Sequence, residues 1–185
     1  FTPISEKYKN DPEGLTRLIN RFLTCMTDIV IKNGGTIDKF MGDCIMAFWN
    51  APLITDDHQA KAVATAKQMK LSLIKLNNKF KAEGLPSINI GIGINTGEVL
   101  FGNMGSEQRF DYSILGDAVN LAARLEAAAG RNDYKEWKII ISESTMKKCK
   151  EFDFDSIGKI KVKGKEELIT IYSPLTSTVS YLTSE

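Results

Sequence analysis

Residues 36–49 read Thr-Ile-Asp-Lys-Phe-Met-Gly-Asp-Cys-Ile-Met-Ala-Phe-Trp. β-Branched, aromatic and small apolar residues stand on both sides of Gly42-Asp43, and a Gly-Asp pair between two such runs is a strong turn signal. The stretch therefore predicts a β-hairpin with the Asp43 carboxylate at its tip. An acidic group at an exposed tip offers the hard oxygen ligands that Mg²⁺ prefers. Gly-Asp is also an ordinary turn former, so the pair alone leaves both interpretations open.

A second Gly-Asp pair lies within residues 111–126, which read Asp-Tyr-Ser-Ile-Leu-Gly-Asp-Ala-Val-Asn-Leu-Ala-Ala-Arg-Leu-Glu. This pair leads into a predicted helix on which Asn120 and Arg124 are four residues apart. The spacing puts an amide and a guanidinium on one face. On an arbitrary helix the two would be a solvated polar pair, but within this motif and its apolar neighbours they are better explained as functional.

Together the two stretches resemble the catalytic domain of the class III nucleotidyl cyclases, the adenylyl and guanylyl cyclases, and most of all the bacterial-type adenylyl cyclases. The run Val-Lys-Gly-Lys at 162–165 is similar to the same family. The resemblance covers nearly the whole chain. It implies that residues 1–185 are a single cyclase catalytic domain that lacks its first strand, with a polar, frayed tail at 175–185.

The order of apolar patterns predicts an α+β fold, with helices packed on one mainly antiparallel sheet. We expect long helices between Pro12 and Gly34 and from about Asp56 to Gly84. The alternating stretch 88–102 predicts a second hairpin that turns at Thr96-Gly97. A helix after Gly116 and strands at 138–141, 159–162 and 168–172 follow. The resemblance narrows this fold to the ferredoxin-like, palm-type core of class III cyclases.

The amino-acid composition of the chain limits the kinds of partner that it can bind. The 185 residues are 43% apolar and 25% charged, which is ordinary for a globular domain, and the net charge of +1 argues against nucleic acid as a partner. The three cysteines show no metal or disulfide spacing. No apolar run approaches the roughly 20 residues that span a bilayer. We therefore expect a cytoplasmic domain without membrane contact of its own, either free or as part of a larger, membrane-attached protein.

The resemblance also implies the metal and phosphate contacts. Asp43 would be one of two metal-binding aspartates, and two Mg²⁺ or Mn²⁺ ions would occupy each site. The other aspartate belongs to a motif that ends in the equivalent of Phe1-Thr2, so it would lie upstream of Phe1. The backbone around Phe1 and Thr2 would receive the substrate phosphates, as would Lys163. By spacing alone, Lys163 in its Lys-Gly-Lys turn would be a solvated lysine.

By the same resemblance, Arg124 would face the charge that develops on the α-phosphate, and Asn120 would orient the ribose. Lys39 and Ser113 match the pair that selects the base. A lysine donor with a hydroxyl acceptor fits adenine, whose N1 accepts and whose N6 donates, whereas guanylyl cyclases carry glutamate at the position of Lys39. Adenylyl cyclases usually carry Asp or Thr where this chain has Ser113.

The resulting hypothesis is an adenylyl cyclase that makes 3′,5′-cyclic AMP and pyrophosphate from ATP as a signalling output domain. Because the chain carries both metal-binding and substrate-binding residues of the family, the resemblance implies a head-to-tail homodimer with shared sites and an upstream sensory or regulatory domain. Two alternatives stay open: a non-catalytic nucleotide-binding dimer that regulates a partner, and a guanylyl cyclase.

Overall fold

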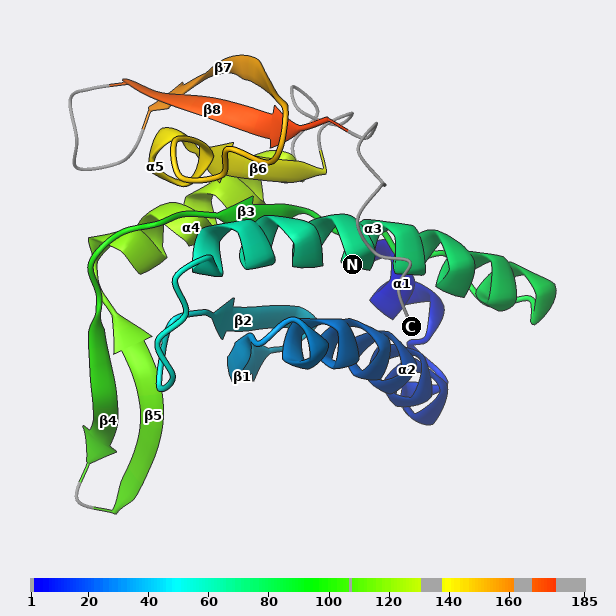
Figure 1. Cartoon of the computed structure of the whole chain (residues 1–185). Helices are drawn as coiled ribbons and strands as arrows, with labels where there is room; N and C mark the ends of the chain where they lie inside the picture. The colour runs from blue at the N-terminus through cyan, green and yellow to red at the C-terminus, as the bar shows by residue number, and fades with distance from the viewer. Residues whose placement is uncertain (1, 107, 131–137, 162–167, 176–185) are drawn as a thin grey trace. The chain divides into compact units, whose positions relative to one another are not determined.

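The computed structural model describes residues 2–106, 108–130, 138–161 and 168–175 (Figure 1). Two compact units are present, the first formed by residues 1–56 and 64–89 and the second by residues 57–63 and 90–185. The elements, in chain order, are α1 (Thr2–Lys7), α2 (Pro12–Lys32), β1 (Thr36–Met41), β2 (Cys44–Phe48), α3 (His58–Ala82), β3 (Ile92–Ile94), β4 (Leu100–Ser106), β5 (Arg109–Leu115), α4 (Asp117–Ala129), β6 (Ile139–Ser142), α5 (Glu143–Met146), β7 (Phe154–Lys161) and β8 (Leu168–Pro174).

Helix α2 of the first unit confirms the predicted helix and its end signals. The side chain of Asp11 accepts a hydrogen bond of 2.8 Å from the backbone N–H of Gly14, and Pro12 occupies the first helical turn. After the helix, Gly34 adopts a φ of 71°, which favours glycine. One apolar stripe at i, i+4 spacing is buried: Leu18, Phe22, Met26 and Val30.

Arg21 joins α2 to the end of α3 within this unit. The two terminal nitrogens of its guanidinium donate to the two carboxylate oxygens of Glu83, at 2.5 and 2.8 Å. The same guanidinium lies 4.7 Å above the centre of the Phe80 ring, whose side chain is fully buried. A second bridge runs from Asn33 Nδ2 to Gln68 Oε1 at 2.8 Å. The planar, two-point contact of Arg21 with Glu83 adds geometric specificity as well as attraction.

We expect the Arg21–Glu83 pair to stabilise the fold in a pH-dependent way. The hydrogen bonds from Arg21 lower the pKa of the Glu83 carboxyl below its usual value. A carboxyl with a lowered folded-state pKa adds stability above its unfolded pKa and loses it as pH falls through the folded one. The loss in free energy of unfolding caused by Glu83→Gln should therefore be constant near neutral pH and shrink below about pH 4.

Urea unfolding of the wild type and Glu83→Gln from pH 7 to pH 3 measures this difference. Glu13→Gln is the matched control, because the Glu13–Arg17 pair is longer, at 3.7 Å, and more exposed. Glu13→Gln should lower the free energy of unfolding less than Glu83→Gln does at neutral pH. If the loss caused by Glu83→Gln were as large at pH 3 as at neutral pH, the ion pair would not be its source.

The second unit contains a four-stranded sheet in the order β3-β6-β8-β7. Strand β3 pairs parallel with β6, and the other neighbours pair antiparallel. The α+β class is confirmed. The predicted hairpin over residues 88–102 is wrong, because β4 pairs with β5 and not with β3. The strands predicted at 138–141, 159–162 and 168–172 correspond to β6, β7 and β8, while the turn around Lys163 and the tail at 176–185 lie outside the described residues.

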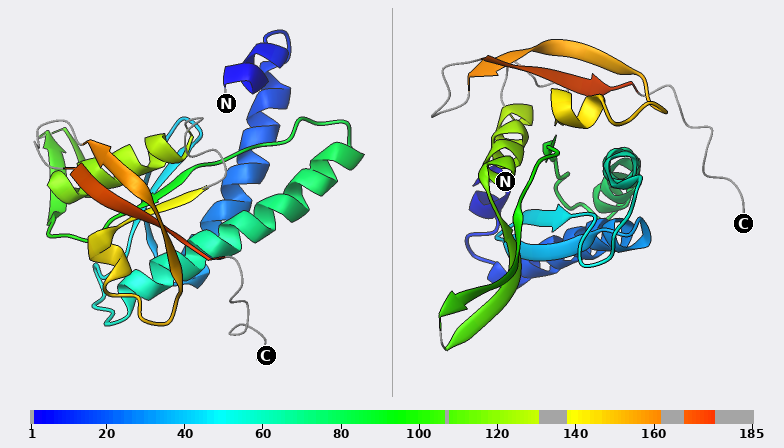
Figure 2. Two further views of the ribbon diagram at one scale, coloured as in Figure 1. Left: turned by 90° about the horizontal axis from the view of Figure 1, so that it is seen from above. Right: turned by 60° about the vertical axis from the view of Figure 1, so that its left-hand side comes forward.

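The β4–β5 hairpin extends away from this sheet (Figures 1 and 2). It exposes a series of large apolar side chains, and the rings of Phe101 and Tyr112 lie 6.0 Å apart on neighbouring strands. Leu100 and Tyr112 are 71% and 69% exposed. The other exposed large apolar residues of the two strands are Phe101, Phe110 and Leu115. A narrow ribbon with this much exposed apolar surface is typical of a protein interaction surface.

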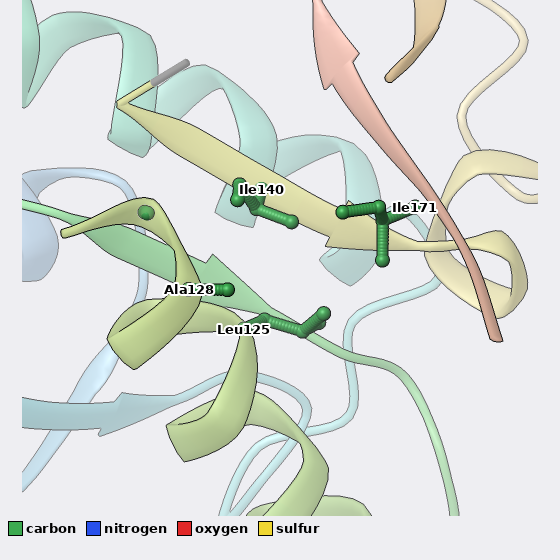
Figure 3. Close-up of a cluster of buried hydrophobic side chains, with 5 residues drawn as sticks. Leu125, Ala128, Ile140 and Ile171 are labelled. Atoms are coloured by element: carbon green, nitrogen blue, oxygen red, sulfur yellow. The ribbon is translucent and has the colours of Figure 1, made fainter. Parts of the chain in front are cut away.

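Helix α4 packs closely on β3 because glycines leave room for its backbone. A Cβ atom at Gly93 would collide with the backbone N of Glu126 and the carbonyl O of Ala122, and one at Gly91 would meet Ala129 Cβ at 3.0 Å. The two glycines therefore allow a close approach of the helix to the strand. Figure 3 shows the apolar side chains of α4 directed toward the strands. This core consists of Leu125, Ala128, Ala129, Ile140 and Ile171.

Gly93→Ala should destabilise the protein by about 1–3 kcal/mol, because the new methyl group would meet backbone atoms that have little room to move. Chemical denaturation of the two proteins measures the change. Gly102→Ala is the matched control, since a Cβ at Gly102 has no neighbour within 4 Å in the described structure. If both variants lost equal stability, the contact with α4 would not be the cause.

Within residues 2–106, 108–130, 138–161 and 168–175, no helix combines the length and the apolar character needed to cross a bilayer.

Candidate active site

The hairpin of β1 and β2 forms as predicted and places Asp43 at its tip. Met41 and Cys44 pair directly, which leaves Gly42 and Asp43 as a two-residue loop. Gly42 has a φ of 65°, as the first central residue of a type II′ turn requires. The Asp43 side chain is exposed. A charged carboxylate on a short loop between two paired strands is both accessible and well positioned.

A β-bulge in β1 sets the direction of Lys39. Ile37 pairs with Ala47 and Lys39 pairs with Met46, so Asp38 is an extra residue in the strand. The Asp38 side chain is 1% exposed, whereas that of Lys39 is 46% exposed. Asp38 Oδ1 lies 3.6 Å from Lys39 Nζ. The lysine therefore has a buried carboxylate beside it and still presents its ammonium group toward solvent.

Sequence reasoning did not single out Asp38. Simple alternation along the strand would place residues 36, 38 and 40 on one face, and the bulge breaks this alternation. The acidic residue directly before Lys39 was the only sequence signal for a carboxylate beside the lysine. Adjacent strand residues normally point to opposite faces, so this signal was weak.

Ser113 lies on β5, opposite Gly102, and is buried. Two residues later β5 ends, and Gly116 leads into α4. Gly116 has a φ of 155° and gives the helix no side-chain cap. Asp117 is the acidic residue of the first turn, where a carboxylate is favoured by the helix dipole. The second Gly-Asp pair thus begins a helix, as predicted.

Helix α4 has one face that packs against the sheet and another face that is polar. Leu125 and Ala128 are buried against the sheet, while Asn120 is exposed and Arg124 is half-buried. Asn120 and Arg124 are one turn apart and lie on neighbouring positions of the helix surface. Because the helix is anchored along its other side, the backbone from which these two side chains project has a well-defined position.

The predicted site residues divide between the two units. Lys39 and Asp43 share one hairpin in the first unit. Ser113, Asn120 and Arg124 belong to the continuous strand-to-helix segment of the second unit. Thr2 begins α1, but its side chain, like Phe1 and Lys163, lies outside what the structure describes.

The donor set can be tested against a divalent metal. In the part of the chain that the structure describes, no three His, Cys, Asp or Glu side chains come together. The Asp43 carboxylate is exposed and is a ligand type that suits Mg²⁺ or Mn²⁺. Its chemistry fits the metal-binding role that the resemblance implies.

Comparison with known proteins gives one consistent result. Residues 1–173 match the family described as "Adenylate and Guanylate cyclase catalytic domain". An adenylate cyclase of Anabaena cylindrica is 38% identical over 180 residues, which are 93% of this chain and 34% of that protein. The chain thus spans about a third of the length of this curated relative.

Two solved structures resemble the fold closely. The guanylyl cyclase Cya2 superposes with a TM-score of 0.82 at 34% identity, over 94% of this chain and 85% of that one. The adenylyl cyclase CyaB of P. aeruginosa superposes with a TM-score of 0.80 at 36% identity, over 88% and 83% of the two chains.

Proposed function

Because the chain belongs to the adenylate and guanylate cyclase catalytic-domain family, we propose that it is an adenylyl cyclase. It converts ATP to 3′,5′-cyclic AMP and pyrophosphate and acts in the cytoplasm as a signalling output domain. The observation that carries this proposal is α4, which buries one face against the sheet and presents Asn120 and Arg124 on another. Relatives with both specificities belong to the family, so the choice of ATP rests on Lys39 and Ser113.

In the proposed reaction the ribose 3′-hydroxyl loses its proton to water and its oxygen attacks the α-phosphorus. The new O–P bond forms, and the bond to the pyrophosphate oxygen breaks. Negative charge develops around the α-phosphorus. Arg124 stabilises that charge, since a planar guanidinium with five donors suits phosphate oxygens. Asn120 hydrogen-bonds the ribose and orients its hydroxyl. Two Mg²⁺ or Mn²⁺ ions, held in part by Asp43, would activate the 3′-oxygen and neutralise the leaving group.

Contacts at the ends of the nucleotide complete the site. Lys39 donates to adenine N1, and the Ser113 hydroxyl accepts from N6. The backbone at Phe1 and Thr2, together with Lys163, receives the phosphates. Buried or partly buried donors and acceptors discriminate strongly, because the wrong base leaves them unpaired. The burial of Ser113 and the carboxylate beside Lys39 support a role in selection rather than in general attraction.

We further propose that two copies assemble head to tail. The β4–β5 hairpin, with its exposed Leu100, Phe110, Tyr112 and Leu115, supplies apolar surface that a second chain would cover. Each site would then combine Asp43 of one copy with Asn120 and Arg124 of the other. An upstream regulatory domain would control this assembly, and the second metal-binding aspartate would precede Phe1.

The deciding experiment measures cyclic nucleotide formation by protein that includes the natural residues upstream of Phe1, with ATP and GTP in parallel and Mn²⁺ present. Cyclic AMP from ATP, at a rate that rises more than linearly with protein concentration, is the expected result. ATP binding without product would instead support a non-catalytic nucleotide-binding module that regulates a partner.

A guanylyl cyclase is the second candidate, favoured by the similarity to Cya2. Lys39 distinguishes the two. Because guanine presents O6 as an acceptor and N1–H as a donor, Lys39→Glu should lower ATP turnover at least about tenfold and raise the ratio of GTP to ATP turnover. Steady-state kinetics with both nucleotides measure this ratio.

Lys32→Glu is the matched control for Lys39→Glu, since Lys32 is an exposed lysine of the same unit at the end of α2. It should leave the ratio unchanged. Full ATP selectivity in Lys39→Glu would remove Lys39 from base recognition.

A further inference from the structure

Asn95 connects the end of β3 to the first turn of α4. It follows β3 directly, and its Nδ2 donates a hydrogen bond of 2.9 Å to the carbonyl oxygen of Ala118. Ala118 lies two residues before Asn120 on the same helix. This bond is a contact from outside the helix to a backbone carbonyl of its first turn.

A group of hydroxyls holds Asn95 in place. Ser144 Oγ lies 3.1 Å from Asn95 Oδ1 and 2.8 Å from the carbonyl oxygen of Thr96, so its proton is shared between two acceptors. Thr96 Oγ1 and Thr145 Oγ1 are 2.9 Å apart, and Thr145 is fully buried. Ser142 Oγ, 2.9 Å from Ser144 Oγ, connects the group to the end of β6. Ser144 itself is exposed, whereas Ser142 and Thr145 are buried, so the group is anchored from its buried side. Satisfied polar groups that are buried in this way specify one arrangement.

Close packing leaves the start of α4 little freedom to shift. A Cβ atom at Gly97 would meet Ala118 Cβ at 2.8 Å, and the backbone of Ala122 already lies against Gly93. The glycines let α4 lie close against the strand, but they make no polar contact that would fix where the helix sits along its own axis. The hydrogen bond from Asn95 to Ala118 fixes that position.

We propose that Asn95 is a positioning residue, which sets the placement of the first turn of α4 and through it the geometry of Asn120 and Arg124. The catalytic part of this inference rests on the adenylyl cyclase activity proposed above. Misplacing a reacting group by about 1 Å can cost on the order of 100-fold in rate. The proposed role of Asn95 involves no contact with substrate, because Asn95 acts only through the position of α4.

Asn95→Asp tests the donor alone, because it keeps the shape and the acceptor for Ser144 but places a carboxylate oxygen against the Ala118 carbonyl. We expect kcat to fall about 10- to 100-fold, with a KM for ATP within about threefold of the wild type. Relative to the wild type, activity should recover as pH falls toward the ordinary aspartate pKa of about 4, where a protonated carboxyl can again donate. Ser144→Ala, a milder change to the same network, should lower kcat by a smaller factor.

Asn77→Asp is the matched control. Asn77 also makes two hydrogen bonds, from its Nδ2 to the carbonyl of Ile88 and to its Oδ1 from the Ile88 N–H, both at 2.8 Å, but it lies in the first unit. It should lower the melting temperature by a similar amount and leave kcat within twofold. Equal kcat values for Asn95→Asp and Asn77→Asp would overturn the proposal.

Hydrogen–deuterium exchange separates this inference from the proposed activity. Amides of residues 117–124 should exchange faster in Asn95→Asp than in the wild type, and at the wild-type rate in Asn77→Asp. An inactive wild-type protein would refute the cyclase proposal, and the exchange rates would still decide whether Asn95 places α4. Unchanged exchange in residues 117–124 of Asn95→Asp would overturn the placement itself.

Discussion

Asp43→Asn is expected to abolish cyclic nucleotide formation, with a loss of at least about 100-fold in kcat, because a neutral amide is a much poorer metal ligand than a carboxylate. Asparagine is as good a turn former as aspartate and has nearly the same shape. The hairpin should therefore keep its two-residue loop between Met41 and Cys44. Steady-state kinetics over a range of Mn²⁺ concentrations measure both the rate and the apparent metal affinity.

Asp28→Asn is the control for this change, since Asp28 is another exposed aspartate of the same unit, on α2. It removes the same charge from the chain and should leave the rate and the Mn²⁺ dependence unchanged. The melting temperature of Asp43→Asn should stay within a few degrees of the wild type. Wild-type activity in Asp43→Asn would mean that the hairpin tip does not bind the metal and that Asp43 only forms the turn.

Local signals were sufficient for the elements that carry the candidate site. The Gly42-Asp43 turn, the start of α2 at Pro12 and the Gly116 boundary of α4 depend on backbone conformations that a few neighbouring residues determine. The i, i+4 spacing of Asn120 and Arg124 likewise needs only the helix period. For this reason the sequence predicted where these side chains lie on their own elements.

Strand partners were not predictable in the same way. The alternation in residues 88–102 indicates extended chain but does not identify the neighbouring strand, and alternation alone predicts a hairpin within the same stretch. In the structure β3 pairs parallel with the distant β6, and α4 lies in the connection between them. Parallel pairs need a crossover of this kind, so their partner is set by packing far along the chain.

Side-chain contacts that depend on such packing were missed for the same reason. Asp38 is buried beside Lys39 because of a bulge in β1, and a bulge has no clear signal in one sequence. Asn95 meets Ala118 and Ser144 only after β3, α4 and α5 have assembled. Each of these residues is an ordinary polar side chain in the sequence.

Arg124→Lys should lower kcat by about 100- to 1,000-fold, although the positive charge remains. Lysine is a point charge with one nitrogen, whereas the guanidinium donates two parallel hydrogen bonds with a set geometry. Because the interaction strengthens as charge develops on the α-phosphate, the loss should appear in kcat, with KM for ATP changed only a few-fold. Asn120 and the buried face of α4 are untouched by this substitution.

Arg17→Lys is the matched control, since Arg17 is an exposed arginine of α2 whose side chain contacts Glu13 at 3.7 Å. It should leave kcat and KM unchanged. A rise in KM at constant kcat for Arg124→Lys would contradict the assigned role, because the guanidinium would then bind the substrate equally in its ground and transition states. The kcat-to-KM pattern therefore decides whether α4 acts on the reacting phosphate or only holds the nucleotide.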